Sequence, residues 1–205
     1  MQKEWGETIV RVFFVRHAQP EYAWKDERTR PLTEEGKEDA GKVLEFLRDK
    51  NIGRFYCSPY KRSIDTILKS AEYFQKEIVT DERFREREAG PNGNNREMFQ
   101  KRWTDHEYHE NGGESIAMVQ KRNIKALEEI LSDCGARGEK NEDENVVIGT
   151  HGTALSSILN YYDRSFDCDS FLRIIDWMPY IIELDFEDGK LAGTAEHIYV
   201  EKEFK

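Results

Sequence analysis

TIVRVFFVRHA, residues 8–18, is the stretch that decides the fold of this chain. Its apolar part, residues 8–15, is rich in β-branched and aromatic side chains and therefore predicts a buried strand. Residues 145–149 (NVVIG) form a second short apolar run that ends in glycine. Each run leads into a histidine motif, with His17 after the first and His151 after the second.

The same strand-to-helix pattern occurs a third time. Residues 54–57 (RFYC) predict a short strand, and residues 61–74 show the apolar spacing of a helix. In open α/β sheets, the carboxyl ends of strands and the amino ends of the following helices meet in one crevice, which attracts anions. Arg62 in the first helical turn opposes the helix dipole, so its position suggests a bound anion, and its forked donors fit phosphate oxygens. The three junctions together predict an anion-binding edge of the sheet.

Six short strings follow one another along the chain: VRHAQP, PLTEEGKEDA, YCSPYKRSIDTI, FREREAG, GGES and GTHG. In this order they resemble the histidine phosphatase superfamily, also called the phosphoglycerate-mutase-like family. The matches extend from Val12 to Gly152, which is most of the chain. A single histidine dipeptide would be a weak signal, whereas the ordered set is specific.

The resemblance implies an α/β fold of the phosphoglycerate-mutase-like type, a three-layer α/β/α sandwich with a mostly parallel central sheet. Residues 154–161 then read as a helix, and residues 180–186 and 196–200 as late strands at an antiparallel edge. The 38% of hydrophobic residues can form one sizeable core, and no linker divides the chain. We therefore expect a single histidine phosphatase domain over residues 1–205.

The resemblance also implies which residues attack and hold a phosphoryl group. His17 matches the family's nucleophile, which forms a phosphohistidine. An imidazole can attack only when neutral, so its other nitrogen is expected to donate a hydrogen bond to a backbone carbonyl. The matched arginines would hold the phosphoryl group in line and stabilise the charge on its oxygens. The residues predicted to bind the phosphate are Arg16, Gln19, Arg62, His151 and Gly152, of which Arg16, Arg62 and His151 also count as catalytic.

A carboxylic acid is needed as well, because an alkoxide is a poor leaving group until it is protonated. The same carboxylate can later deprotonate the water that cleaves the phosphohistidine. FREREAG, residues 84–90, matches the family's acid segment, and the match places the general acid/base on Glu86. Glu82 and Glu88 are neighbouring carboxylates, and Glu88 is the second choice for this role.

The sequence predicts no metal and no cofactor, because positive side chains can replace the usual magnesium ion. His106 and His109 lie three residues apart, whereas a helical zinc pair with an internal glutamate base needs a spacing of four. No cysteine stands in a paired ligand spacing. The stretch around these histidines, residues 105–110 (DHEYHE), reads as a solvated helical or loop face.

Composition restricts the partners. The net charge of −10 disfavours nucleic acid and anionic membranes as partners. The resemblance implies a small-molecule phosphate ester as the partner. The oligomeric state stays open, with a homodimer among the alternatives. The scattered Cys57, Cys134 and Cys168 are typical of reduced thiols, and residues 1–10 lack the apolar core of a signal peptide. We therefore expect a cytoplasmic protein.

Three departures from the family pattern affect the functional prediction. Ala18 stands where the family usually has glycine, and it would be strained if the backbone there required a positive φ. Residues 91–98 (PNGNNREM) lack the tryptophan-glutamate-glycine string of many members. The chain also shows no segment that would close over a phosphohistidine, as a mutase requires. A phosphatase is thus favoured over two alternatives, phosphoryl transfer of the phosphoglycerate mutase type and a weakly active module that binds phosphate.

Other segments have structural interpretations. Thr33 and Ser115 read as the N-caps of helices, so the GGES string is explained as a helix start. Residues 21–30 and 91–111 are expected to select the substrate. Aromatic residues in them can line a leaving-group pocket, although such side chains are at least as often packing residues: Tyr22, Trp24, Phe99, Trp103 and Tyr108.

Overall fold

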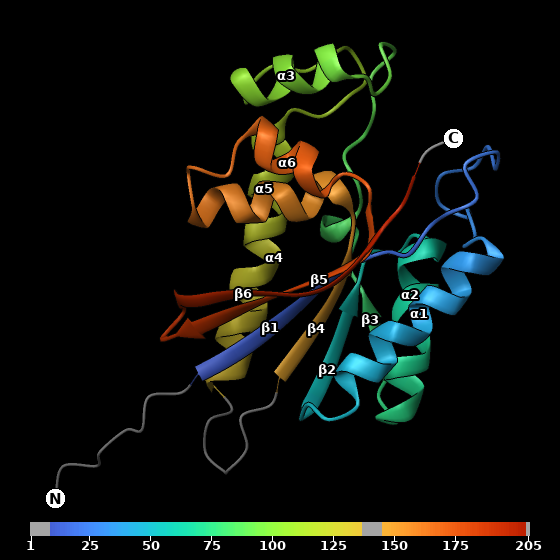
Figure 1. The fold of residues 1–205 in the computed structure, drawn as a ribbon. Coiled ribbons are helices and arrows are strands. Elements are labelled where there is room, and N and C mark those ends of the chain that lie inside the picture. The colour runs from blue at the N-terminus through green and yellow to red at the C-terminus, as the bar shows by residue number, and fades with distance from the viewer. Residues whose placement is uncertain (1–8, 137–144, 204–205) are drawn as a thin grey trace, which may run out of the picture.

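The computed structural model describes residues 9–136 and 145–203. At its centre lies a six-stranded sheet with the strand order β3-β2-β4-β1-β5-β6 (Figure 1). The strands are β1 (Ile9–Arg16), β2 (Ile52–Cys57), β3 (Ile78–Thr80), β4 (Asn145–Thr150), β5 (Trp177–Glu187) and β6 (Lys190–Glu201). The strands β1 to β4 pair in parallel, whereas β5 and β6 pair antiparallel and form one edge. The predicted mostly parallel sheet with an antiparallel edge is confirmed.

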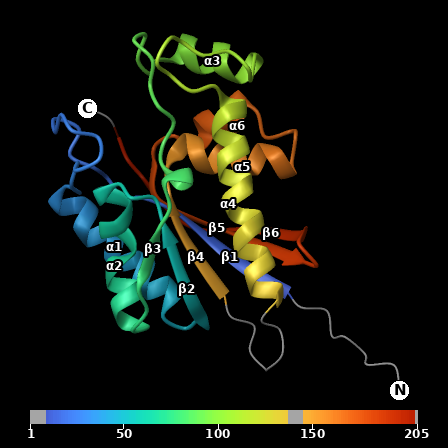
Figure 2. The ribbon, with the colours of Figure 1, turned by 180° about the vertical axis from the view of Figure 1, so that it is seen from behind.

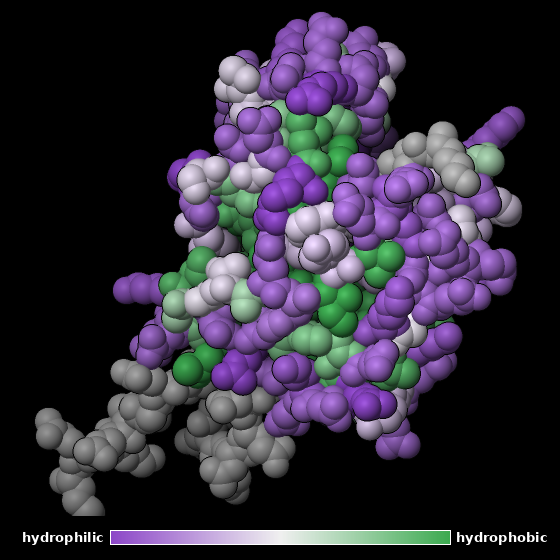
Figure 3. All heavy atoms as spheres, viewed as in Figure 1, coloured by the Kyte–Doolittle hydropathy of each residue, from purple (hydrophilic) through white to green (hydrophobic). Residues whose placement is uncertain are grey.

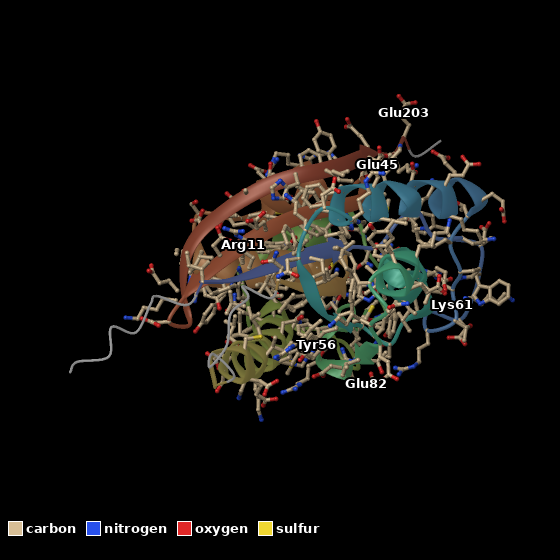
Figure 4. The ribbon with its side chains drawn as sticks, turned by 90° about the horizontal axis from the view of Figure 1, so that it is seen from below. Arg11, Glu45, Tyr56, Lys61, Glu82 and Glu203 are labelled. Carbon is tan, nitrogen blue, oxygen red and sulfur yellow. The ribbon has the colours of Figure 1, made fainter. Side chains whose placement is uncertain are left out.

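Helices cover both faces of the sheet. They are α1 (Glu34–Leu47), α2 (Lys61–Tyr73), α3 (Arg96–Thr104), α4 (Ile116–Ala136), α5 (Gly152–Tyr162) and α6 (Cys168–Ile174), and a 3-10 turn, η1, spans Glu82–Phe84. The helices α1 and α2 lie on one face, and α4 and α5 on the other (Figure 2). Figure 4 shows these layers from below, with Glu45 on α1 and Lys61 at the start of α2. The predicted three-layer sandwich is therefore confirmed.

Side-chain alternation along β1 joins the three layers. Phe13 and Val15 point to the face under α1 and α2, where they pack in one apolar cluster. Val12 and Phe14 point to the opposite face, where they pack with residues of α4 and α5 in a second cluster. A strand buried on both faces needs a continuous apolar run rather than an alternating one, as residues 12–15 have.

The predicted helix starts agree with the structure. The Thr33 hydroxyl accepts a hydrogen bond from the backbone N–H of Gly36 (2.9 Å), and that of Ser115 accepts one from Met118 (3.1 Å). The helix α2 differs, because it has no side-chain cap and no acidic residue in its first turn. Within the described ranges, no helix is both long and apolar enough to cross a lipid bilayer.

The late strands are longer than predicted. Asp188 and Gly189, with φ of 49° and 75°, form a tight turn between β5 and β6. Two successive residues with positive φ suit the right-handed twist of a two-stranded hairpin, so pairing continues up to the turn on both sides. The turn thereby extends β6 back to Lys190, well before the predicted start at residue 196.

The prediction of a solvated face for residues 105–110 is wrong at one residue. Glu110 is 6% exposed and forms an ion pair with Arg102 of α3, which is 1% exposed. Arg102 also donates to the carbonyl of Gly93 (2.8 Å) and to the side chain of Asn94 (3.1 Å). The further hydrogen bonds of the two terminal nitrogens help to offset the cost of burying this pair. Periodicity could not show it, since most other charged residues of the stretch face solvent.

Candidate active site

The carboxyl ends of three neighbouring strands bring the first site residues together. In the sheet register, Arg16 at the end of β1 lies beside Thr150 at the end of β4. The backbone N–H of His17 donates to the carbonyl of Thr150 (3.1 Å). The N–H of Ser58, which follows β2, donates in the same way to Gly149 (2.9 Å). Residues that are remote in sequence are thus held at one sheet edge by backbone hydrogen bonds.

His17 is buried, and its ring has one hydrogen-bonding arrangement. Its Nδ1 lies 2.8 Å from the carbonyl oxygen of Ala18, and because a carbonyl only accepts, Nδ1 carries the hydrogen. Burial lowers the pKa of His17 well below its usual value, and the charges of Arg62 and Arg16 lower it further. The ring is therefore neutral, with the lone pair on Nε2, where Arg62 Nε donates at 3.3 Å.

Ala18 fits its position without backbone strain. Among the described non-glycine residues, only Gln75 and Asp188 have a positive φ, so Ala18 does not require the conformational freedom of glycine. Its side chain is fully buried, and its N–H donates to the hydroxyl of Thr66 on α2 (2.9 Å). The departure from the family's usual glycine leaves the backbone around His17 well held.

Arg62 contacts the segment of residues 21–30 as well as His17. Its Nη1 donates to the backbone carbonyl of Glu27 (2.7 Å), and its Nη2 lies 3.3 Å from the Glu27 carboxylate. Arg30 lies 2.6 Å from the other oxygen of the same carboxylate. A protein carboxylate is therefore held between two guanidinium groups beside the His17 ring. The anion beside the positive charge of α2's first turn is thus a side chain of the protein itself, and a bound anion at Arg62 stays a prediction.

Arg16 is fixed from two sides. Its two terminal nitrogens donate to the carbonyls of Ile174 and Ile175 at the end of α6, while Nε is buried and has no hydrogen-bond partner in the described part of the chain. Gly152 lies directly against the guanidinium group, where an added Cβ would be 3.2 Å from Nη2. Gly152 therefore leaves room for the Arg16 guanidinium group, which is a structural reason for a glycine at this position.

His151 lies opposite His17. The two ring centroids are 5.2 Å apart, and His151 Nε2 is 2.7 Å from the hydroxyl of Ser58. Burial lowers the pKa of His151 well below its usual value, and Arg62 and His17 lower it further. Ser58 was not predicted as a site residue, although it lies in the YCSPYKR string, directly after a predicted strand. That position was the signal that could have identified it.

Glu86 reaches the same place from the irregular segment after η1. Its carboxylate accepts hydrogen bonds from the N–H groups of Thr153 (3.1 Å) and Ala154 (3.2 Å) in the first turn of α5. It also accepts one from the N–H of Arg87 (2.7 Å). Because α5 begins directly after His151, these bonds place the carboxylate at the end of α5 that His151 caps. Glu88, the second choice, is exposed, and its N–H bonds to Glu114 instead.

Two other residues with predicted site roles, Gln19 and Trp103, contact other parts of the protein. The amide oxygen of Gln19 accepts a hydrogen bond from Thr33 at the N-cap of α1 (3.2 Å), and its phosphate-binding role stays a prediction.

Trp103 is buried against Phe171 of α6, with ring centroids 5.5 Å apart, so it is a packing residue. Figure 3 shows hydrophobic residues where the α3 segment meets the body of the protein. Tyr22 and Trp24 are both about half exposed, in the segment that contacts Arg62.

The arrangement as a whole is a small cationic centre on an acidic protein. Two buried arginines and two neutral imidazoles lie together, although the net charge of the chain is −10. Among the described residues, no group of three or more His, Cys, Asp and Glu side chains is placed to hold a metal ion. Such a site can bind an anion, offer an imidazole lone pair to it, and exchange a proton with a carboxylate.

The fold and this site define a class of protein. Residues 12–191 match the sequence profile of the histidine phosphatase superfamily (branch 1). The chain belongs to this superfamily.

Individual relatives are more distant. Phosphoserine phosphatase 1 of Hydrogenobacter thermophilus is 27% identical over 157 residues, which cover 70% of this chain and 71% of that protein. A mycobacterial glucosyl-3-phosphoglycerate phosphatase superposes with a TM-score of 0.74 at 20% identity, covering 94% of this chain and 99% of its own. The phosphoglycerate mutase of Bacillus anthracis superposes with a TM-score of 0.70 at 16% identity, covering 91% and 92%. The two superpositions show the shared fold.

Proposed function

We propose that the protein is a metal-independent phosphomonoester hydrolase that works through a phosphohistidine on His17. The observation that carries the proposal is the state of the His17 ring. It is neutral, its Nδ1 hydrogen is bound to the Ala18 carbonyl, and its Nε2 lone pair lies beside Arg62. That is the form in which an imidazole is nucleophilic.

The first half-reaction follows from the contacts. Nε2 of His17 attacks phosphorus, an N–P bond forms, and the P–O bond to the alcohol breaks. Arg62, which donates to Nε2 in the free protein, must turn its donors to the phosphoryl oxygens. Arg16 lies at the same sheet edge, and its Nε has no hydrogen-bond partner among the described residues. A proton from Glu86 then converts the leaving alkoxide to an alcohol.

The second half-reaction reverses the proton transfer. The Glu86 carboxylate takes a proton from water, the oxygen of that water attacks phosphorus, and the N–P bond breaks. Inorganic phosphate leaves, and the neutral His17 is restored. The N–H groups of Thr153 and Ala154 hold the carboxylate at the start of α5 throughout, so the base needs no large movement between steps.

The name of one relative supports hydrolysis: Phosphoserine phosphatase 1, which matches 70% of this chain, is named as a phosphatase. We place the protein in the cytoplasm, where its three free cysteines would stay reduced. A small phosphate ester is its proposed substrate.

A labelling experiment tests the nucleophile. The protein is incubated with a chromogenic aryl phosphate in excess EDTA, quenched early, and analysed for acid-labile phosphate on His17, with His17→Ala as the control. We expect rapid labelling of the wild type and none of the variant. Turnover without labelling, or labelling that survives the substitution, would falsify the assignment. Transfer of the label to an added phosphoglycerate instead of to water would show a mutase.

A further inference from the structure

The segment that carries Glu86 lacks regular structure of its own. After η1, residues 85–90 belong to no helix or strand, so no backbone ladder fixes the position of the carboxylate. General acid/base catalysis depends on hydrogen-bond distance, and a displacement of about 1 Å can cost about a hundredfold in rate. Other contacts must therefore hold this segment in place.

Arg122 of α4 supplies the first set of contacts. Its Nη1 donates to the backbone carbonyls of Arg83 (2.6 Å) and Arg85 (2.8 Å). Its Nη2 donates to the carbonyl of Glu86 itself (3.1 Å). The side chain is only 14% exposed. One guanidinium group on a packed helix thus holds three carbonyls of the segment.

Glu114 supplies the second set. Its carboxylate accepts hydrogen bonds from Nε and Nη2 of Arg122 (2.9 and 3.0 Å) and from both terminal nitrogens of Arg85 (2.5 and 3.0 Å). It also accepts one from the N–H of Glu88 (2.9 Å). Burial alone would raise the pKa of Glu114, but the hydrogen bonds from Arg85 and Arg122 lower it to about 2. The carboxylate is therefore charged at every working pH and binds the segment on both sides of Glu86.

The GGES string brings Glu114 this close. The N–H of Glu114 donates to the carbonyl of Glu88 (3.0 Å), so the two segments run against each other. A Cβ added to Gly113 would lie 2.9 Å from the backbone nitrogen of Gly90, nearer than side chains are found. The string is therefore more than a helix start, because its glycine permits the approach and its glutamate makes the contact.

We propose that Arg122 and Glu114 are positioning residues that hold the general acid/base Glu86 against the first turn of α5. Arg122 fixes the backbone of Glu86 from α4, while Thr153 and Ala154 receive its carboxylate. The side chains of both residues bond to residues 83–88 and to each other, so both act through Glu86. The proposal rests on the proposed function, in which Glu86 protonates the leaving group.

Arg122→Lys is the test variant. Lysine keeps the charge, but a single ammonium group cannot replace the planar fork that bridges three carbonyls and a carboxylate. For an alkyl phosphate, we expect kcat/KM to fall by about tenfold to a hundredfold. For an aryl phosphate, which needs little protonation, we expect a loss of less than about threefold. Glu114→Gln is the second variant, with the same selective loss expected.

A matched control removes another contact between the same helix and the same segment. Glu129 of α4 pairs with Arg83 (2.7 Å), away from Glu86 and more than half exposed. Glu129→Gln should leave the ratio of alkyl to aryl phosphate hydrolysis unchanged. Thermal unfolding and the inhibition constant for inorganic phosphate are measured for all variants. If either Arg122→Lys or Glu114→Gln fails to fold, the other of these two serves as the test variant.

A double substitution tests whether Arg122 affects activity only by positioning Glu86. On the Glu86→Gln background, Arg122→Lys should cause no further loss with the alkyl phosphate, because the group that it positions is gone. Equal losses with alkyl and aryl esters, or additive losses in the double variant, overturn the positioning role. A wild type that hydrolyses neither ester and acquires no phosphohistidine refutes the proposed function instead, so the two failures are distinct.

Discussion

Replacing Glu27 with glutamine tests whether phosphate must displace a carboxylate of the protein itself. The Glu27 carboxylate lies 3.3 Å from Arg62 Nη2 and 2.6 Å from Arg30 Nη2. Arg62 also donates to Nε2 of His17, so this carboxylate is held beside the proposed nucleophile. A phosphate that binds Nη2 of Arg62 has to compete with it. We expect Glu27→Gln to bind inorganic phosphate more tightly than the wild type.

The size of the effect follows from the exposure of the partners. The Glu27 side chain is 54% exposed, whereas those of Arg62 and Arg30 are 4% and 14% exposed. Ion pairs with a solvated partner contribute about 0.2 to 1 kcal/mol each, and the buried guanidinium groups place both pairs near the upper end. Only the pair with Arg62 competes directly with phosphate, and its loss removes about 1 kcal/mol of competition, which is about a fivefold lower inhibition constant.

The assay is competitive inhibition of aryl phosphate hydrolysis by inorganic phosphate at fixed ionic strength. Glu82→Gln is the control, because it removes the same charge from a residue that pairs with the exposed Arg28 instead of Arg62. If inorganic phosphate binds more tightly to both variants by the same factor, the effect comes from net charge alone. An unchanged or weaker inhibition constant in Glu27→Gln would refute the competition.

Further predictions concern packing and protonation. Gly152→Ala should lower kcat/KM about threefold to tenfold in steady-state assays, because its Cβ would displace the Arg16 guanidinium by a few tenths of an ångström. The free energy of unfolding should decrease as the pH falls below about 6.5, since the unfolded chain takes up protons that the buried His17 and His151 refuse. Urea titrations at several pH values should show a slope of up to about 1.4 kcal/mol per pH unit for each histidine. Leu127→Ala should cost about 2 to 5 kcal/mol in the same titrations, because the side chain is fully buried in the core between α4 and the sheet.

Local patterns in the sequence predicted most of the fold. The apolar run before His17 becomes β1, and the fully buried run before His151 becomes β4. Thr33 and Ser115 cap the helices that they were expected to cap. Such features depend on neighbours within a few residues, so side-chain periodicity and capping preferences suffice to identify them. The ordered motifs then supplied the family, which the sequence profile confirms.

Contacts between residues far apart in the sequence could be identified only from the folded structure. Glu86 meets α5 across 67 residues, and Arg62 meets Glu27 across 35. Nothing in the spacing of FREREAG shows that Arg122 would hold its backbone, or that Glu110 would be buried with Arg102.

By itself, the sequence determined which residues lie at the carboxyl edge of the sheet, because strand and helix patterns depend only on neighbouring residues. Only the tertiary structure decided which irregular segments reach that edge. Their positions come from hydrogen bonds and ion pairs between distant loops, and those contacts have no period along the chain.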